Sequence, residues 1–137
     1  MKDIKSFLSN VTLNDEHKVF VIIKPGFENL IEKICETFKN KGYKIIKMKT
    51  KRLLESEAKE LYKMHKDEEF YDSLCKYMSS DKTTAFILYK KTANNIFKEF
   101  AKIKDDIREK YGESDMRNVI HSSDSYKNFK HESEIYF

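Results

Sequence analysis

The residues between 117 and 125 have the types and spacing best suited to chemistry. His121 closes a short apolar run, and Ser123, Asp124 and Ser125 follow with side-chain oxygens that can cap the start of a helix. A neutral imidazole, the usual form at pH 7, is a nucleophile that can accept a phosphoryl group and return it to a second acceptor. The amide dipoles of a helix start favour anionic oxygens nearby. This pattern indicates phosphoryl transfer, although a lone histidine is also typical of structural and surface positions.

The bulk composition fits one folded domain. The chain has 137 residues, 36% of them charged, and a formal net charge of +4 with both signs interspersed. This mild positive balance suits phosphate-bearing ligands but lacks the strongly basic face typical of nucleic-acid binding, so we expect no nucleic-acid partner. We expect a single domain over residues 1–137, in which residues 1–17 form an amino-terminal arm or a short helix.

The cysteines and the apolar runs bear on the location of the protein. Cys35 and Cys75 are isolated, so free buried thiols are expected rather than a disulfide or a zinc site. No apolar run approaches membrane-spanning length, and the first residues lack the hydrophobic stretch of a signal peptide. We therefore expect an intracellular, cytoplasmic protein with no membrane partner.

Four segments read as strands and five as helices. The predicted strands are residues 19–23, 43–48, 83–89 and 118–121, and the first ends at the strong stop Lys24-Pro25-Gly26. Apolar residues at helical spacing predict helices at 30–38, 53–65, 69–79, 93–103 and 125–134, and Gly42 fits the C-cap of the first. Residues 104–116 read as polar and irregular, with at most one helical turn.

The order of these elements predicts the fold class. The first two strands are separated by a helix, and so are the last two, which is consistent with a split βαβ arrangement. We expect an α+β, ferredoxin-like sandwich in which a four-stranded antiparallel sheet is covered by helices on one face. No internal repeat, low-complexity tract or linker interrupts the chain.

The active-site stretch resembles that of a known family. Residues 118–125, Asn-Val-Ile-His-Ser-Ser-Asp-Ser, resemble the nucleoside diphosphate kinase signature, whose usual form is Asn-x-x-His-Gly-Ser-Asp-Ser. Residues 21–25, Val-Ile-Ile-Lys-Pro, resemble the family's first-strand Ile-Lys-Pro-Asp. Weaker matches follow in the family's order at Lys41-Gly42-Tyr43, Leu61-Tyr62, Phe70 with Leu74, Ile107-Arg108, and Glu132 before Tyr136-Phe137. The resemblance covers roughly residues 18–137 and implies a phosphotransferase acting between nucleoside triphosphates and diphosphates.

The resemblance assigns the catalytic roles residue by residue. It implies that His121 is the phosphorylated nucleophile and that Glu132 and Ser123 hold its imidazole by hydrogen bonds. A positioned carboxylate also stabilises the ring as it gains positive character. Glu132 lies eleven residues after His121, about two turns into the last predicted helix, so it could fold back over the site. The alternative for Glu132 is a solvated charge on that helix.

The resemblance also implies a set of nucleotide-binding residues, of which Lys24 and Tyr62 belong to the catalytic set as well. Lys24 would contact phosphates or ribose, Tyr62 would donate its hydroxyl to the terminal phosphates, and Arg108 would bind phosphate bidentately. Asn118 would bond the ribose and phosphate edge, while Phe70 stacks on the base and Leu74 lines the opposite rim. Stacking reads the π-face, so all four bases should be accepted. Mg²⁺ would arrive with the nucleotide, since no carboxylate cluster forms a dedicated metal site. Plain core packing explains Phe70 and Leu74 equally well.

The sequence departs from the family's pattern at three places. Gly26-Phe27 replaces Asp-Gly or Asp-Ala, and Ser122 replaces a glycine, which would cost free energy if that position needs a positive φ. The segment before Arg108 is several residues short and lacks the family's Pro- and Gly-containing loop. That loop usually carries a phosphate-binding threonine and much of the threefold contact of hexamers. We therefore expect weakened nucleotide binding and a homodimer rather than a hexamer.

An arginine of the helix before that loop usually binds phosphate in the family. Lys98 is the best candidate to replace it, with Lys102 and Lys104 as alternatives, although a lysine cannot reproduce the fork of an arginine. A nucleotide-binding or regulatory protein with weak or no kinase turnover is the second hypothesis for the function. An RNA-binding domain of the same fold is disfavoured because the central strands lack an aromatic and basic RNA-binding pattern.

Overall fold

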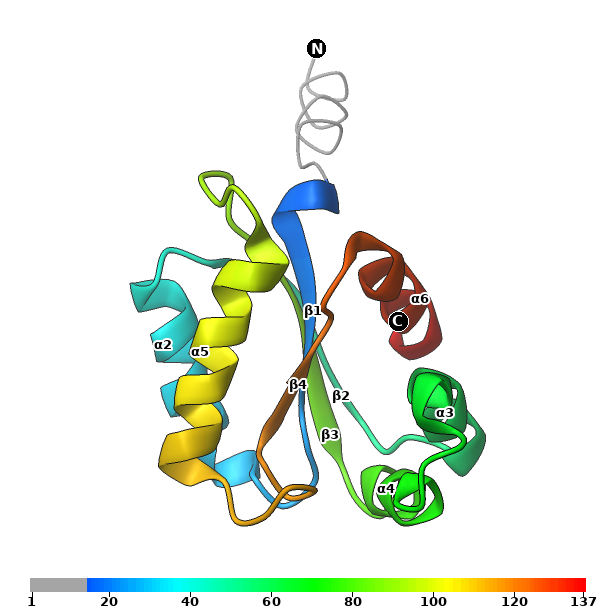
Figure 1. Cartoon of the computed structure of the whole chain (residues 1–137). Helices are drawn as coiled ribbons and strands as arrows, with labels where there is room; N and C mark the ends of the chain where they lie inside the picture. The colour runs from blue at the N-terminus through cyan, green and yellow to red at the C-terminus, as the bar shows by residue number, and fades with distance from the viewer. Residues whose placement is uncertain (1–14) are drawn as a thin grey trace.

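The computed structural model describes residues 15–137, which form one four-stranded sheet and its flanking helices (Figure 1). The strands are β1 (Lys18–Ile23), β2 (Lys44–Lys51), β3 (Thr83–Tyr89) and β4 (Ile120–Ser122). Their order in the sheet is β2-β3-β1-β4, and each neighbouring pair is antiparallel. The predicted element order and fold class are thereby confirmed. The predicted arm at residues 1–17 falls mostly outside the described residues, apart from a 3₁₀ turn at Asp15–His17.

Helices cover both faces of this sheet, so the expectation of a single covered face is wrong. Helices α2 (Ile31–Asn40) and α5 (Ile96–Tyr111) lie on one side, and α3 (Glu55–Leu61), α4 (Tyr71–Met78) and α6 (Tyr126–Tyr136) on the other (Figure 1). The reason is visible in β1, whose successive residues after Lys18 are all buried. A strand that is apolar on both faces needs a layer on each side.

The C-terminal end of α2 shows how a local signal ends a helix. Gly42 has a φ of 89°, and its amide bonds the carbonyl of Lys39 at 3.0 Å while the amide of Tyr43 bonds that of Phe38 at 2.9 Å. This bond pattern is a Schellman motif, in which glycine adopts the left-handed conformation without a Cβ clash. The prediction of Gly42 as a C-cap is confirmed, and the cap directs the chain into β2.

Helix α5 is much longer than the sequence analysis predicts. It runs through Tyr111 to Gly112, so the expectation of an irregular segment at residues 104–116 is wrong for its first half. Ile103 and Ile107 continue the stripe of Ile96 and Phe100, and all four are buried. No Pro or Gly interrupts the helix before Gly112. A continuous helical stripe packed on the sheet outweighs the polar composition of this segment.

The remaining boundaries differ from prediction by a few residues. β2 extends three residues further than expected, through Lys51. Hydroxyl bonds tie this added length to β3: Thr50 Oγ1 bonds Thr84 Oγ1, and Thr83 Oγ1 donates to the Lys51 carbonyl. The predicted helix at 53–65 divides into α3 and a 3₁₀ turn at Lys63–His65.

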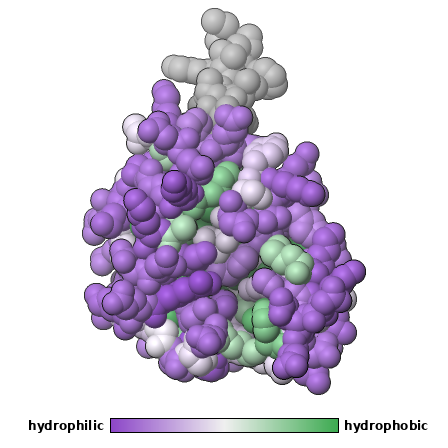
Figure 2. Space-filling model, viewed as in Figure 1, coloured by the Kyte–Doolittle hydropathy of each residue, from purple (hydrophilic) through white to green (hydrophobic). Residues whose placement is uncertain are grey.

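One face of the molecule is shown in Figure 2, and it is predominantly hydrophilic. Figure 2 shows charged and polar residues over most of this face, with exposed hydrophobic side chains around α3 and α4. Within residues 15–137, no helix is long and apolar enough to cross a membrane.

Candidate active site

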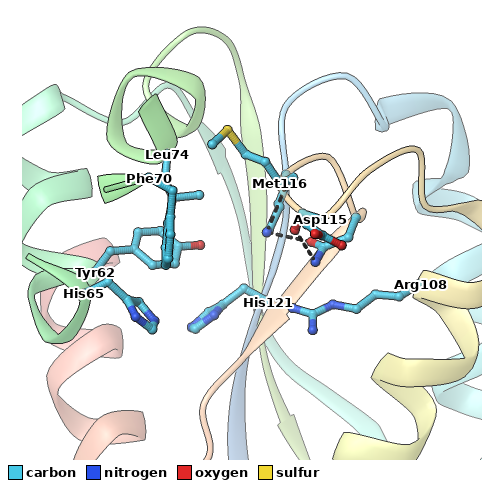
Figure 3. A pocket seen from close by; sticks show the side chains of 10 residues that line it. Tyr62, His65, Phe70, Leu74, Arg108, Asp115, Met116 and His121 are labelled. Atoms are coloured by element: carbon cyan, nitrogen blue, oxygen red, sulfur yellow. Dashed lines mark hydrogen bonds between the residues drawn. The ribbon is translucent and has the colours of Figure 1, made fainter. Parts of the chain in front are cut away.

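A pocket of about 420 Å³ opens where β1 ends, between α4 on one side and the end of α5 on the other (Figure 3). The short segment 112–119 before β4 forms its rim. The pocket has one wall of aromatic and aliphatic side chains and one wall rich in nitrogen. Its lining residues are Lys24, Tyr62, His65, Phe70, Leu74, Arg108, Asp115, Met116, Asn118 and His121.

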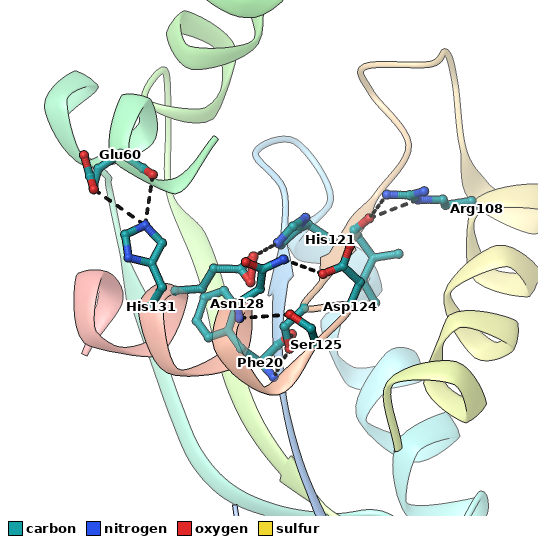
Figure 4. Close-up of polar contacts among 11 residues, drawn as sticks. Phe20, Glu60, Arg108, His121, Asp124, Ser125, Asn128 and His131 are labelled. Carbon is teal, nitrogen blue, oxygen red and sulfur yellow. Dashed lines mark hydrogen bonds and ion pairs between the residues drawn. The ribbon is translucent and has the colours of Figure 1, made fainter. Parts of the chain in front are cut away.

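His121 lies in β4, which places its ring at the pocket. Its backbone pairs with Ile22 of β1, and its Nε2 contacts the Glu132 carboxylate Oε1 from α6 (Figure 4). The rings of Tyr62 and Phe20 pack edge-on against the imidazole, with centroids 5.4 and 6.5 Å away. Within residues 15–137, no protein group hydrogen-bonds Nδ1. Because Nε2–H donates to the carboxylate, Nδ1 carries the free lone pair.

Glu132 is almost completely buried, with a side chain only 1% exposed. Its second carboxylate oxygen, Oε2, has no hydrogen-bond partner among the described residues. A buried carboxylate oxygen without a partner is costly and is retained mainly at functional positions. The structure thus places Glu132 against the His121 imidazole. The alternative, that Glu132 is a solvated charge on the surface of α6, does not fit this burial.

Ser123 does not bond the imidazole, contrary to the expected contact. Its hydroxyl accepts a hydrogen bond of 3.0 Å from the Phe20 amide, and its own amide donates to the Phe20 carbonyl at 2.9 Å. These bonds join the turn after β4 to β1. The physical reason is that Ser123 extends the β4–β1 ladder past its last pair, where backbone groups compete for the hydroxyl. Two residues later, Ser125 caps α6 by accepting from the Asn128 amide, as predicted.

The chain turns sharply just before the active-site strand. Val119 has a φ of 77°, which is rare for a β-branched residue, and the Ile120 amide bonds the Asn118 carbonyl at 3.0 Å. This two-residue closure is a strained γ-turn, stabilised here because the Val119 carbonyl accepts from the Lys24 amide at 2.8 Å. Strain of this kind costs about 1–3 kcal/mol and clusters at functional sites. Ser122, by contrast, has no positive φ, so its replacement of glycine carries no such strain.

Lys24 projects from the end of β1 into the pocket wall. Its Nζ donates to Asn118 Oδ1 at 2.6 Å and to the Met116 carbonyl at 3.2 Å, and the residue is only 5% exposed. The Asn118 amide group is oriented by its own bond from Nδ2 to the Asp115 carbonyl. Burial, reinforced by the charges of Arg108 and Lys104, lowers the pKa of Lys24 to about 7.

Arg108 reaches the same pocket from the last turns of α5. Its Nε and one terminal nitrogen donate to the Ile120 carbonyl at 3.1 and 2.9 Å (Figure 4), which holds the guanidinium in a fixed plane. Burial lowers the pKa of Arg108 from its usual value, although an arginine remains charged. The fork anchors β4 to α5 and leaves the other terminal nitrogen without a protein partner among the described residues.

Lys98 is not part of this pocket, so its selection as the phosphate-binding lysine is wrong. It is exposed in the first turn of α5, about 15 Å along the helix from Arg108. The prediction fails because the helix is longer than expected, which moves its pocket end toward Arg108. Lys104 lies one turn before Arg108 on the same helix face, half buried, and its charge acts on Lys24.

The opposite wall carries the remaining predicted residues. The Tyr62 hydroxyl is buried and has no hydrogen-bond partner in the described part of the chain. Burial, with a smaller contribution from Glu132, raises the pKa of Tyr62, so the hydroxyl stays protonated and can donate. Leu74 is buried, whereas Phe70 is 44% exposed at the pocket mouth. The exposure of Phe70 favours a ligand-facing position over plain core packing.

Three lining residues are missed by the sequence analysis. His65 contacts the Phe70 ring with centroids 5.5 Å apart, and Asp115 and Met116 belong to the rim before β4 (Figure 3). The sequence offers a weak signal for His65, because it lies between Tyr62 and Phe70. Asp115 and Met116 carry no signal, since only the tertiary position of the rim segment brings them to the pocket.

The site is thus a ferredoxin-like scaffold that presents the His121 imidazole to a pocket lined by Lys24, Arg108 and the aromatic ring of Phe70. A nucleophile opposite fixed cations is suited to the transfer of an anionic group. The family model for "Nucleoside diphosphate kinase" matches residues 17–137. A nucleoside diphosphate kinase of Fervidobacterium nodosum is 32% identical over 129 residues, covering 88% of each chain. One of Chloroherpeton thalassium is 33% identical, with 88% of this chain and 92% of the relative covered.

The solved structures agree with the sequence comparisons. The nucleoside diphosphate kinase of Aquifex aeolicus superposes with a TM-score of 0.80 at 26% identity, over 88% of this chain and 94% of that one. The chain belongs to the nucleoside diphosphate kinase family. It is an enzyme of that type, and the family's ligands are nucleoside diphosphates and triphosphates.

Proposed function

We propose that this enzyme transfers the γ-phosphoryl group of a nucleoside triphosphate to a nucleoside diphosphate through a phosphohistidine at His121. The lone pair of Nδ1 attacks the γ-phosphorus, the N–P bond forms, and the bond from phosphorus to the bridging oxygen breaks to release the first diphosphate. A β-phosphate oxygen of the second diphosphate then attacks phosphorus and frees Nδ1. The observation that supports this proposal best is the contact of the Glu132 carboxylate with Nε2 of His121, which leaves Nδ1 as the ring nitrogen available to a ligand.

Glu132 acts on the charge of the ring. When Nδ1 gives its lone pair to phosphorus, the imidazole becomes positive, and a buried carboxylate at Nε2–H stabilises that charge. No proton leaves the ring at this step, because the carboxylate orients and stabilises Nε2–H without removing its hydrogen. Ser123 contributes as a positioning residue, because its bonds to Phe20 hold the turn between β4 and α6.

The cationic wall stabilises the transferring group. Phosphoryl transfer passes through a loose transition state with charge spread over three equatorial oxygens. Lys24, the free nitrogen of Arg108 and the unpartnered Tyr62 hydroxyl are the donors that line the pocket toward such oxygens. Because all three are held by burial or by hydrogen bonds, little reorganisation is needed when the charge develops.

The base and ribose take the outer part of the pocket. Phe70 offers an exposed ring for stacking beside Leu74, and Asn118 lies on the rim next to Lys24. A stacking contact accepts any base, so we propose broad use of nucleotides. Among residues 15–137, no three His, Cys, Asp or Glu side chains converge as a metal site. We propose that Mg²⁺ comes with the nucleotide, whose charge it partly neutralises.

We propose a homodimer formed along the outer edge of β2. This strand is an edge of the sheet, and Met48 on it is 51% exposed. The connection between α5 and β4 is only residues 112–119, which offers little chain for a threefold contact. A stable hexamer in sedimentation would contradict this assembly. Cytoplasmic location and the absence of nucleic-acid binding stay predictions.

The test is transfer from ATP to dTDP by the wild-type enzyme and by His121→Ala. We expect the variant to keep its circular dichroism spectrum and to lose at least about 10⁴-fold in turnover. Wild type incubated with ATP alone should carry an acid-labile, alkali-stable phosphoryl group that His121→Ala lacks. Nucleotide binding without transfer in wild type would instead favour a binding or regulatory role, and a label that persists in His121→Ala would refute the phosphohistidine.

A further inference from the structure

Both hydrogen bonds of Lys24 run to neutral acceptors, so neither of them balances a positive charge on Nζ. Nζ has two acceptors, Asn118 Oδ1 and the Met116 carbonyl, and both are neutral. The bond from Asn118 Nδ2 to the Asp115 carbonyl fixes which end of that amide faces the lysine. A neutral amine has two N–H donors, which these acceptors satisfy, and one lone pair. An ammonium group would have a third N–H with no acceptor among the described residues.

The charges around Lys24 also disfavour a proton on Nζ when the pocket is empty. Helix α5 presents Arg108 and Lys104, both positive, and burial together with these two charges lowers the pKa of Lys24 to about 7. No ion pair joins Lys24 to a carboxylate within residues 15–137. On the rim, Asp115 lines the same pocket but is exposed, so solvent screens its charge.

The other walls offer no compensating anion. From α6, Glu132 is committed to His121 of β4. From the wall of α3 and α4, Tyr62 keeps its proton because burial raises its pKa, and His65 is an imidazole. A phosphate entering the pocket would therefore be the first close anion that Lys24 meets, and it would also accept the third N–H.

We propose that Lys24 is a neutral amine in the empty pocket and that a nucleoside phosphate binds together with one proton, which the Nζ lone pair takes up from solvent. This inference rests on the proposed function, since the ligand is the nucleotide of that reaction. The proton adds to Nζ, and no other bond forms or breaks. The pocket then discriminates by charge, because a nucleoside without phosphates brings no anion to hold the proton.

Two consequences follow from the linkage between proton and ligand. Above pH 7 the affinity for MgADP should fall by about tenfold per pH unit, because each binding event must recruit a proton. Calorimetry of MgADP in buffers of different ionisation enthalpy measures that uptake directly. Relative to Lys24→Arg, which stays charged, wild type should take up about 0.9 protons at pH 8 and about 0.1 at pH 6.

A matched pair of lysine variants tests the same point without altering Lys24. Lys104→Met removes a neighbouring positive charge, so Lys24 should be protonated more often before binding, and uptake at pH 8 should fall. Lys98→Met, on the same helix but remote, should leave the uptake at the wild-type value. Burial also lowers the pKa of Lys104, so Lys104→Arg, which stays charged, is the control for any uptake by Lys104 itself. If Lys24→Arg no longer binds MgADP, wild-type uptake in Lys104→Arg together with reduced uptake in Lys104→Met decides the question.

The outcomes separate this inference from the proposed function. MgADP binding with no net proton uptake at pH 8, or equal uptake by wild type and Lys24→Arg, overturns the inference and leaves the kinase reaction standing. Equal uptake by the Lys104→Met variant and wild type also counts against it. Failure of wild type to bind MgADP at any pH from 6 to 9 refutes the proposed function and this inference together.

Discussion

The two faces of the sheet are built from different chemistry. Under α2 and α5, the core is built from apolar side chains. The Phe38 ring, for example, packs against the rings of Phe86 and Phe100, with centroids 5.5 Å away in both contacts. Under α3, α4 and α6, the core also contains the Tyr62 hydroxyl and Glu132 Oε2, both buried without partners. One face therefore contributes stability, while the other gives up some of it to hold a reactive site.

The largest effect should come from breaking the apolar face. Phe100→Ala removes a fully buried ring that packs on Phe38 and Tyr43, and we expect the free energy of unfolding to fall by about 3–5 kcal/mol. Urea denaturation measures this loss. Turnover per folded molecule should remain near wild type at low temperature, and a selective loss of turnover would contradict the division between the faces. Phe100→Leu is the milder variant if Phe100→Ala does not fold.

On the second face, Glu132→Gln should have the opposite effect to Phe100→Ala: it should lower kcat without lowering the free energy of unfolding. The amide cannot stabilise a positive imidazole, so we expect kcat to fall by about 10²-fold. The free energy of unfolding should not fall, because a buried carboxylate with one unpartnered oxygen is replaced by a neutral group. Steady-state kinetics and urea denaturation of the same preparation check both parts. Unchanged kcat would show that Glu132 is structural.

The effect of Lys24→Met on the free energy of unfolding should depend on pH, which tests whether the site face costs stability. The pKa of Lys24 is lower in the folded chain, so folding releases a proton between about pH 7 and the usual lysine value, and stability from this group rises with pH over that window. Below pH 7 the full penalty of the buried charge applies. We expect Lys24→Met to be more stable than wild type by about 1–3 kcal/mol at pH 6. The advantage should shrink toward pH 10 in denaturant titrations, and a constant difference would contradict the buried-charge explanation.

The smallest effects should distinguish the two ends of α5. Lys104→Ala, near the pocket, should raise KM for ATP by about threefold to tenfold through lost electrostatic attraction, less so at high salt. Lys98→Ala, in the exposed first turn, should change KM by less than about twofold. Initial-rate measurements at two salt concentrations compare them, and a larger effect at Lys98 would restore the rejected assignment.

Much of the fold could be predicted from the sequence because the residues that begin and end many elements act on their near neighbours in the chain. The bounds of β3, the cap at Gly42 and the cap at Ser125 depend on residues within one or two turns of each other. The end of α5 is misjudged because polar composition hides a stripe that only packing makes decisive. The second helical layer is missed because a strand that is apolar throughout does not reveal how each of its faces is covered.

The sequence by itself determined the family and the order of elements, and it singled out His121 as the proposed nucleophile, since all of these depend on residue types and their spacing. Only the tertiary structure decided which partner each polar group takes. Glu132 meets Nε2, Ser123 bonds Phe20 across 103 positions of sequence, and Lys24 meets neutral acceptors 92 and 94 residues away. Such pairings follow from sheet register and burial, which no local pattern encodes.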